Sequence, residues 1–173
     1  MDAAREQFAE LGFERTTIRS VAAAAGVDPA LVMQYFKNKE GLFGASARWH
    51  VDHKKLSEAT LEDVPRTALD DLFAGFEDPS RRDSAIALLR NCLTHEAALD
   101  VMREQVMCEP QAMVAATIGG EQGELRAGLL GATMIGITIA KYLLKIPVVA
   151  EASREQIEQI MTPVLQALVD PER

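Results

Sequence analysis

The sequence is short of cysteine, histidine, positive charge and long apolar runs. Cysteine occurs twice, as Cys92 and Cys108, without C-x-x-C spacing or a secretory leader, so we expect two free, buried thiols and a cytoplasmic protein. His50 and His53 lie three residues apart without a clear third ligand, so we expect no metal site. No Ser/His/Asp set, phosphate-cradling glycine loop or facing carboxylate pair can be assembled, which argues against an enzyme.

Long apolar runs are missing as well. The longest distinctive stretch without charge, residues 127–140, has fourteen residues. A membrane span needs about 18 or more apolar residues, so we expect a helix buried in protein. No segment alternates polar and apolar residues with a period of two, so the sequence predicts an all-α fold. With 173 residues, 48% of them hydrophobic, the chain can build one sizeable core or two modest ones.

Positive charge is scarce but unevenly distributed. The net charge of −8 fits poorly with a nonspecific nucleic-acid coat. Residues 1–55 contain eight Lys/Arg against seven Asp/Glu, a balance of +1, which leaves −9 for the rest. A near-neutral N-terminal segment followed by an acidic remainder is compatible with DNA binding through a few specific phosphate contacts.

Residues 16–36 carry the pattern of two short helices joined by a tight turn. The first helix follows a capping Thr16 or Thr17, and its apolar residues recur at spacings of three, four and seven: Ile18, Val21, Ala22 and Ala25. Gly26 ends it, and Asp28 and Pro29 suit the N-cap and first position of the second helix. In that helix Val32 and Phe36 would pack inward. Ala30, Met33 and Gln34 would then face a DNA major groove.

A third helix is expected to begin after Asn38. Its first residue is Lys39, where the helix dipole favours acids over bases. Together with the unpaired N–H groups of that helix end, this lysine would form a small anion site suited to a DNA phosphate.

At these residues the sequence resembles the tetracycline-repressor (TetR) family of one-component transcriptional regulators. The resemblance rests on F-A-E-L-G-F-E-R-T-T-I at 8–18, V-A-A-A-A-G-V at 21–27 and Y-F-K-N-K-E-G-L-F at 35–43. It implies a helix-turn-helix DNA-binding domain in residues 1–45, followed by a helical ligand-binding and dimerisation domain in residues 46–173. Members usually carry further residues, often basic, ahead of the position of Met1, which leaves open a missing N-terminal arm.

Carried over by position, the resemblance implies a set of DNA contacts: Thr17, Arg19, Pro29, Ala30, Met33, Gln34, Tyr35, Lys37 and Lys39. Many members have an aromatic residue or histidine at the position of Met33, where we expect apolar contact, for example with a thymine methyl. Tyr35 and Arg19 also have ordinary structural interpretations, as a half-buried aromatic and a solvated helix charge.

Helical patterns continue through the rest of the chain. The first helix should bury Ala4, Phe8 and Leu11, and a connector helix should run from Lys39 to about Thr60. Three further helices are expected. The first carries Leu69 to Phe76, and the second starts at Ser80 or Asp83 and buries Ile86, Leu89 and Leu93. The third spans 95–118 with an interruption at Pro110.

The last two helices are expected at residues 124–146 and 154–169. In the resembling family such helices form a four-helix bundle across a twofold axis. The expected interface residues include small residues that recur every four positions on the first helix and apolar residues on the second: Gly128, Ala132, Gly136, Ala140, Ile157, Ile160, Met161, Val164 and Leu168. The alternative is that both helices belong only to the core of one protomer.

The central helices are expected to hold a small apolar effector, as they do in the resembling family. The candidate lining residues are adaptable or apolar: Trp49, Phe73, Phe76, Leu89, Cys92, Leu93, Met102, Met107 and Met113. Each could equally be an ordinary core residue. The resulting hypothesis is a homodimeric, ligand-responsive repressor of a pseudo-palindromic DNA operator, without a cofactor. The rival is an acidic helical dimer that binds proteins or small molecules and has no operator.

Overall fold

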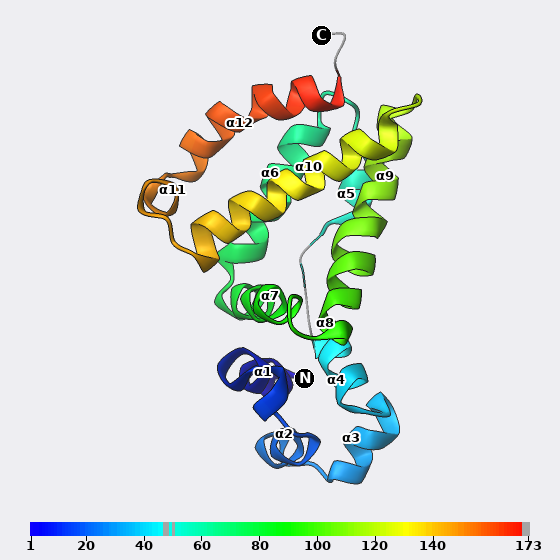
Figure 1. Ribbon diagram of the computed structural model, residues 1–173, viewed down its shortest axis with the longest axis vertical. Coiled ribbons are helices and arrows are strands. Elements are labelled where there is room, and N and C mark those ends of the chain that lie inside the picture. The colour runs from blue at the N-terminus through cyan, green and yellow to red at the C-terminus, as the bar shows by residue number, and fades with distance from the viewer. Residues whose placement is uncertain (47–48, 50, 171–173) are drawn as a thin grey trace. The chain divides into compact units, whose positions relative to one another are not determined.

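The computed structural model describes residues 1–46, 49 and 51–170, with Ser80 described by its backbone alone (Figure 1). Every regular element in this part of the chain is helical, which confirms the all-α prediction. None of the helices described is both long and apolar enough to cross a membrane. The chain forms two compact units, one made of residues 1–49 and 77–104 and the other of residues 50–76 and 105–173.

The first unit contains the helix-turn-helix region and two helices from the middle of the chain. Its helices are α1 (Asp2–Arg15), α2 (Ile18–Ala25), α3 (Pro29–Phe36), α4 (Lys39–Ser46), α7 (Pro79–Asn91) and α8 (Glu96–Val101). Within the unit α1 packs on α7, and α4 packs on α8. Residues 77–104 therefore share one compact body with the N-terminal helices.

Aromatic rings form the centre of the first unit. Phe8 and Phe43 meet edge to face with ring centroids 4.9 Å apart, and Phe13 and Phe43 do so at 5.4 Å. Ala4 and Phe8 are buried as expected, but the prediction for Leu11 is wrong because its side chain is exposed. Gly12 leaves the helical path with φ 77° and ψ 173°, so that Phe13 takes the inward position instead.

The expected connector helix from Lys39 to about Thr60 is wrong. Helix α4 ends at Ser46, Val51 and Asp52 are not helical, and α5 spans His53–Glu58. The Asp52 carboxylate accepts the backbone N–H of Lys55 at 3.0 Å, which starts a new helix at this point. His50, one of the two histidines considered as metal ligands, lies outside the described residues.

The methionine-rich segment is helical without a break. Helix α8 leads into the π-helix η1 (Met102–Cys108) and then into α9 (Glu109–Ile118), so the expected interruption at Pro110 is wrong. A wider π-helical turn directly before the proline relieves the clash that its ring would make with a preceding carbonyl. Helix α7 begins at Pro79, and Leu93, expected inward, is 88% exposed because α7 ends at Asn91.

The second unit is built around α6 (Val64–Glu77), α10 (Gly123–Thr138) and α12 (Arg154–Val169), with η2 (Ile139–Leu143) and α11 (Pro147–Glu151) between the last two. The bounds of α12 match the predicted helix. Two apolar clusters hold the unit together, and their buried members are Leu56, Val64, Val114, Ala127, Leu130 and Val169 in one and Leu69, Leu72, Phe73, Ile157 and Leu165 in the other.

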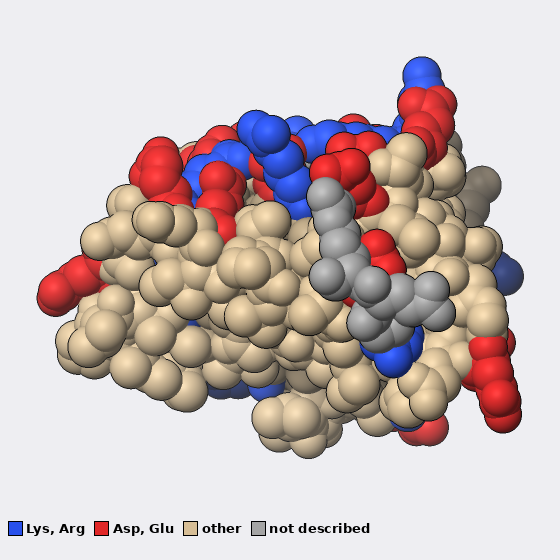
Figure 2. All heavy atoms as spheres, turned by 90° about the horizontal axis from the view of Figure 1, so that it is seen from above, with Lys and Arg blue, Asp and Glu red and all other residues tan. Residues whose placement is uncertain are grey.

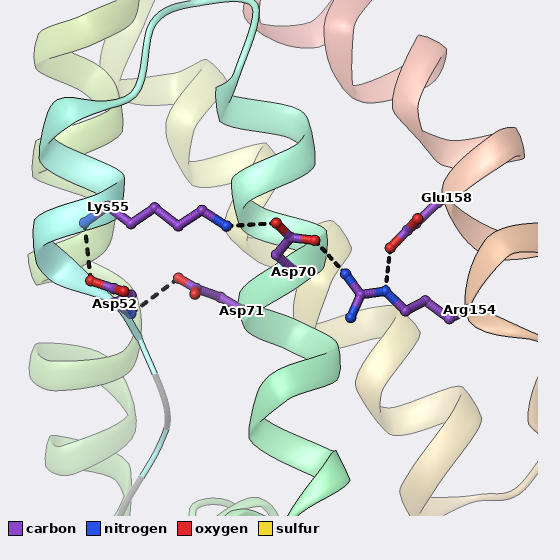
Figure 3. Close-up of polar contacts among 6 residues, drawn as sticks. All are labelled: Asp52, Lys55, Asp70, Asp71, Arg154 and Glu158. Atoms are coloured by element: carbon purple, nitrogen blue, oxygen red, sulfur yellow. Dashed lines mark hydrogen bonds and ion pairs between the residues drawn. The ribbon is translucent and has the colours of Figure 1, made fainter.

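Asp70 joins three helices of the second unit through ion pairs (Figure 3). Its carboxylate accepts from Lys55 of α5 at 2.5 Å and from the guanidinium of Arg154 at the start of α12. Arg154 also pairs with Glu158 at 2.5 Å and covers the ring of Phe73 at 5.3 Å. Because these groups are partly exposed, each pair contributes at most about 1 kcal/mol, and the network orients α12 more than it stabilises the unit.

Candidate nucleic-acid interface

The turn between α2 and α3 is fixed by caps on both sides. Thr17, one of the two caps that the sequence offered, caps α2 in a reciprocal pair of hydrogen bonds with Ser20. Gly26 ends α2 in the left-handed conformation, with φ 66°. Asp28 then accepts the backbone N–H of Ala30 at 2.7 Å, with Pro29 at the first position of α3. These contacts confirm the predicted caps and set the angle at which α3 leaves the turn.

Most residues of helix α3 are exposed, and Phe36 is half-buried. Val32 is its one buried residue, and it packs toward the unit's interior as predicted. The expected reading residues Pro29, Ala30, Met33 and Gln34 are all exposed. Leu31, which lies between the exposed Ala30 and the buried Val32, is exposed too and was not among the expected contacts.

Tyr35, Lys37 and Arg19 lie on the outside of the same motif. Tyr35 is 73% exposed, so the alternative interpretation of this residue as a half-buried aromatic is wrong. Arg19 and Lys37 are also exposed. Lys37 ends α3 with φ 66°, and its backbone N–H donates to the carbonyl of Met33 at 2.8 Å. Such a conformation is uncommon for a lysine, and the sequence offers no signal for it.

Lys39 has partners inside the unit. Its ammonium donates to the backbone carbonyl of Glu14 at 3.1 Å and lies 4.4 Å from the ring centroid of Phe13. Asn38 caps α4 as expected, with its Oδ1 accepting the N–H of Gly41 at 2.7 Å. An ammonium group has three N–H donors, so Lys39 can hold the end of α1 and still donate to an anion.

Side chains of α1 support the start of α2. The Gln7 Nε2 donates to the carbonyl of Ser20 at 3.0 Å, and the Ser20 hydroxyl donates to Gln7 Oε1 at 2.6 Å. Sequence reasoning missed this contact because a polar residue on the first helix has no spacing that marks its partner. The cap of α2 is therefore held by α1 as well as by Thr17.

The candidate effector residues fall into both compact units. Phe73, Phe76, Met107 and Met113 belong to the second unit, whereas Trp49, Leu89, Cys92, Leu93 and Met102 belong to the first. Phe73 lies in an apolar cluster, and Phe76 stacks on Tyr142 with ring centroids 4.1 Å apart. Leu93, with its side chain almost fully in solvent, is left out of any cavity.

The two thiols differ in their surroundings. Both cysteines are free, as expected. Burial raises the pKa of the Cys92 thiol, whose Sγ donates to the carbonyl of Leu89 at 3.3 Å. Cys108 is exposed, so the expectation that it is buried is wrong: η1 turns this last residue to the surface. Across the described part of the chain, no three His, Cys, Asp or Glu side chains gather where they could hold a metal ion.

One face of the second unit is apolar and exposed. Ile160 of α12 is 66% exposed and Val164 is 55% exposed, and Leu129 of α10 is exposed as well. Ala132 and Gly136 are exposed on α10, and nothing lies within 4 Å of a Cβ built on Gly136. Figure 2 shows charged side chains gathered along one side of this end of the molecule, beside a broad stretch with hardly any.

Other members of the predicted interface set are engaged within the protomer. Ile157 is buried in the apolar cluster with Leu165, and Leu168 and Met161 pack against the clusters. Gly128 faces α9, since a Cβ there would lie 3.1 Å from Nε2 of Gln111. The expectation that the uncharged stretch is buried therefore holds for one face of α10 only.

Two short capped helices in a tight turn, with an exposed second helix, define a helix-turn-helix DNA-binding protein. The sequence matches the description "Bacterial regulatory proteins, tetR family" over residues 1–45 and "Tetracyclin repressor-like, C-terminal domain" over residues 62–169. The chain belongs to the TetR family of transcriptional regulators, which confirms the resemblance seen in the sequence.

Individual relatives support this assignment. The HTH-type transcriptional regulator BetI of Serratia proteamaculans (strain 568) is 32% identical over 90 residues, which cover 49% of this chain and 46% of that protein. The chain thus matches less than half the length of this relative. A TetR-family regulator from Streptomyces coelicolor A3 is 24% identical with a TM-score of 0.66, covering 96% of this chain and 90% of that one.

A further structural relative is SmeT, solved as a complex with triclosan. It is 20% identical with a TM-score of 0.69, and the match covers 94% of this chain and 87% of that one. At such identities the two structural matches show a shared fold and carry no information on operator or effector.

The close packing of Gly41 gives a first prediction. A Cβ at this position would lie 2.1 Å from the backbone carbonyl oxygen of Phe36, so the Gly41→Ala variant must shift the join between α3 and α4. We expect its free energy of unfolding, measured by urea denaturation, to fall by about 2 kcal/mol or more.

Gly44 on the same helix is the matched control. A Cβ there would make an ordinary contact with Val101 at 3.6 Å. The Gly44→Ala variant should be as stable as the natural protein or up to about 1 kcal/mol more stable, because alanine favours helix. Equal losses in the two variants would contradict the packing described here.

Proposed function

We propose that this protein is a homodimeric repressor that binds a pseudo-palindromic DNA operator and is released by a small apolar effector. The observation that carries the DNA-binding part is the exposure of α3, which buries Val32 and presents apolar and polar side chains to solvent. Met33 at 45% exposure and its neighbour Gln34 are suited to a thymine methyl and to an adenine edge, respectively.

Two kinds of contact are proposed. Gln34 reads base edges, whereas Arg19, Tyr35, Lys37 and Lys39 bind phosphates on either side of the groove. The distinction is physical, since base contacts carry sequence information and phosphate contacts carry salt-dependent affinity. We propose the corresponding domain division, with a DNA-binding domain in residues 1–45 and a domain for effector binding and dimerisation in residues 46–173.

Selection of bound fragments from random duplex DNA tests operator binding. We expect an enriched inverted repeat whose half-sites lie about one helical turn apart. On that duplex the Gln34→Ala variant should lose about 1–3 kcal/mol of discrimination against a mutated half-site. The Lys37→Gln variant should weaken binding on every sequence and flatten the slope of log affinity against log salt by about 2 for a dimer.

Arg103→Gln is the control, because it removes the same charge from an exposed position outside the helix-turn-helix. It should leave both specificity and salt slope unchanged. If no inverted repeat is enriched and neither Gln34→Ala nor Lys37→Gln has an effect, the protein is the acidic binding module that has no operator.

The partner subunit is proposed to pack on the exposed apolar face of α10 and α12. Exposed residues of this face are Leu129, Ala132, Gly136, Ile160 and Val164. Monomeric proteins rarely leave a contiguous apolar surface in water, and small residues on a helix allow another helix to approach closely. Ile157, which is buried in the protomer, is left out of the proposed contact.

A charge on this face should dissociate the dimer. The Ile160→Glu variant would bury a carboxylate without a partner in the interface, so we expect a monomer by sedimentation equilibrium, with an unchanged helical circular dichroism spectrum. Gln159→Glu adds the same charge at the neighbouring exposed position and should remain dimeric. A dimeric Ile160→Glu protein would place the interface elsewhere.

The effector is proposed to bind among the apolar helices of the second unit. Phe73 and Phe76 of α6 supply aromatic surface, and Met107 and Met113 supply side chains that adapt to irregular apolar shapes. The SmeT–triclosan complex supports this part of the proposal, since a relative of the same fold holds a small molecule. Release requires that the effector bind the DNA-incompetent state more tightly.

Effector release can be tested without knowing the natural ligand. Apolar compounds that raise the melting temperature of the protein would be titrated against a gel shift of the selected operator. We expect at least one of them to weaken operator affinity about 5-fold or more, the usual lower range of allosteric coupling. Compounds that bind yet all leave the affinity unchanged would refute effector control, and compounds without a thermal shift serve as negative controls.

A further inference from the structure

A buried asparagine outside the helix-turn-helix holds the end of α1. Asn91, the last residue of α7, is 8% exposed. Its Oδ1 accepts the backbone N–H of Phe13 at 3.2 Å, and its Nδ2 donates to the carbonyl of Ala87 at 2.7 Å. The second bond fixes the amide so that its oxygen faces Phe13.

The backbone needs this partner because α1 is interrupted at this point. Gly12 adopts φ 77° and ψ 173°, so the helical path breaks directly before Phe13. A buried N–H must find an acceptor, and a buried donor without one is costly. The acceptor comes from a side chain 78 residues further along the chain.

The segment that follows the break leads directly to the predicted DNA contacts. The buried Thr16 shares its single O–H between two backbone carbonyls, with Oγ1 2.8 Å from the oxygen of Gly12 and 3.0 Å from that of Gln7. The next residue, Thr17, is both the N-cap of α2 and a predicted DNA contact. Residues 12–17 therefore form a short strap, held by Asn91 at one end and continuous with the start of α2 at the other.

The same strap holds Lys39, a predicted phosphate contact. The ammonium of Lys39 rests on the Glu14 carbonyl and the Phe13 ring, both within the strap. His95, just beyond α7, packs its ring against Phe13 with centroids 4.7 Å apart and places Nδ1 3.5 Å from the Glu14 carboxylate. A shift of the strap would displace the cap of α2 and the seat of Lys39 together.

We infer that Asn91 is a positioning residue for DNA binding: by holding the strap, it places Thr17 and Lys39 where they reach the DNA. The inference rests on the proposed function, because it concerns the same DNA-binding face. It assigns residues 77–104, which lie outside the helix-turn-helix, a direct part in the geometry of that face.

The test compares salt slopes on duplex DNA. Natural protein and variants would be titrated by fluorescence anisotropy on a random-sequence duplex of about 30 base pairs, long enough for two half-sites, at several KCl concentrations. Asn91→Leu has a similar volume but no acceptor. It should flatten the salt slope by about 2 for a dimer, since each head would leave one more phosphate unbound, and it should speed amide exchange at Phe13.

Two variants separate positioning from mere stabilisation. Asn91→Asp keeps an acceptor for the Phe13 N–H but loses the donor to the Ala87 carbonyl, so it should recover only part of the natural slope. Leu88→Val shortens a fully buried side chain on the same helix and should lower the melting temperature while leaving the slope unchanged. A protein that is only less stable contains fewer active molecules, but each one makes the same phosphate contacts.

The results that overturn the inference are distinct from a failure of the proposed function. If the natural protein binds no duplex at low salt, DNA binding itself fails and the inference falls with it. If the natural protein binds and Asn91→Leu keeps its slope, or changes it no more than Leu88→Val does, Asn91 has no positioning role. If Asn91→Leu does not fold, Thr16→Val is the substitute, because it removes the hydroxyl that holds the same strap. An unchanged salt slope in that variant overturns the inference.

Discussion

The packing of three phenylalanine rings is the contact on which the DNA-binding end of this protein depends. Phe8, Phe13 and Phe43 join α1 to α4, and nearly all of their surface is buried. About 45 residues are too few to bury a self-sufficient core. Helices α7 and α8 supply the missing cover, which explains why residues 77–104 share a compact unit with the N-terminal helices.

This arrangement leaves most residues of α3 exposed. Helix α3 buries only Val32, so its eight residues are stabilised mainly by the Asp28 cap, the turn at Gly26 and its contacts with α2 and α4. A short helix with one buried residue would not form alone in water. The surrounding helices provide its stability and leave its outer side chains available for DNA.

Local chemistry made part of this structure predictable from the sequence. The caps at Thr17, Asp28 and Asn38 and the span of α12 depend on neighbouring residues, and the sequence indicated them correctly. What escaped prediction depends on distant groups: the acceptor that Asn91 offers to Phe13, and the seat of Lys39 on the Glu14 carbonyl. The non-helical backbone at Trp49, Val51 and Asp52 was also missed, because glycines in α4 weaken helical signals without locating an end.

The route of the chain joins the two compact units through helical backbone. The chain passes from one compact unit to the other at 76/77 and at 104/105, and both crossings lie inside helices, α6 and η1. Helix α6 contributes Leu69 and Phe73 to an apolar cluster, and α7 follows after one residue and ends at Asn91. Helix α6 of the second unit is therefore followed along the chain by the helix that holds the strap.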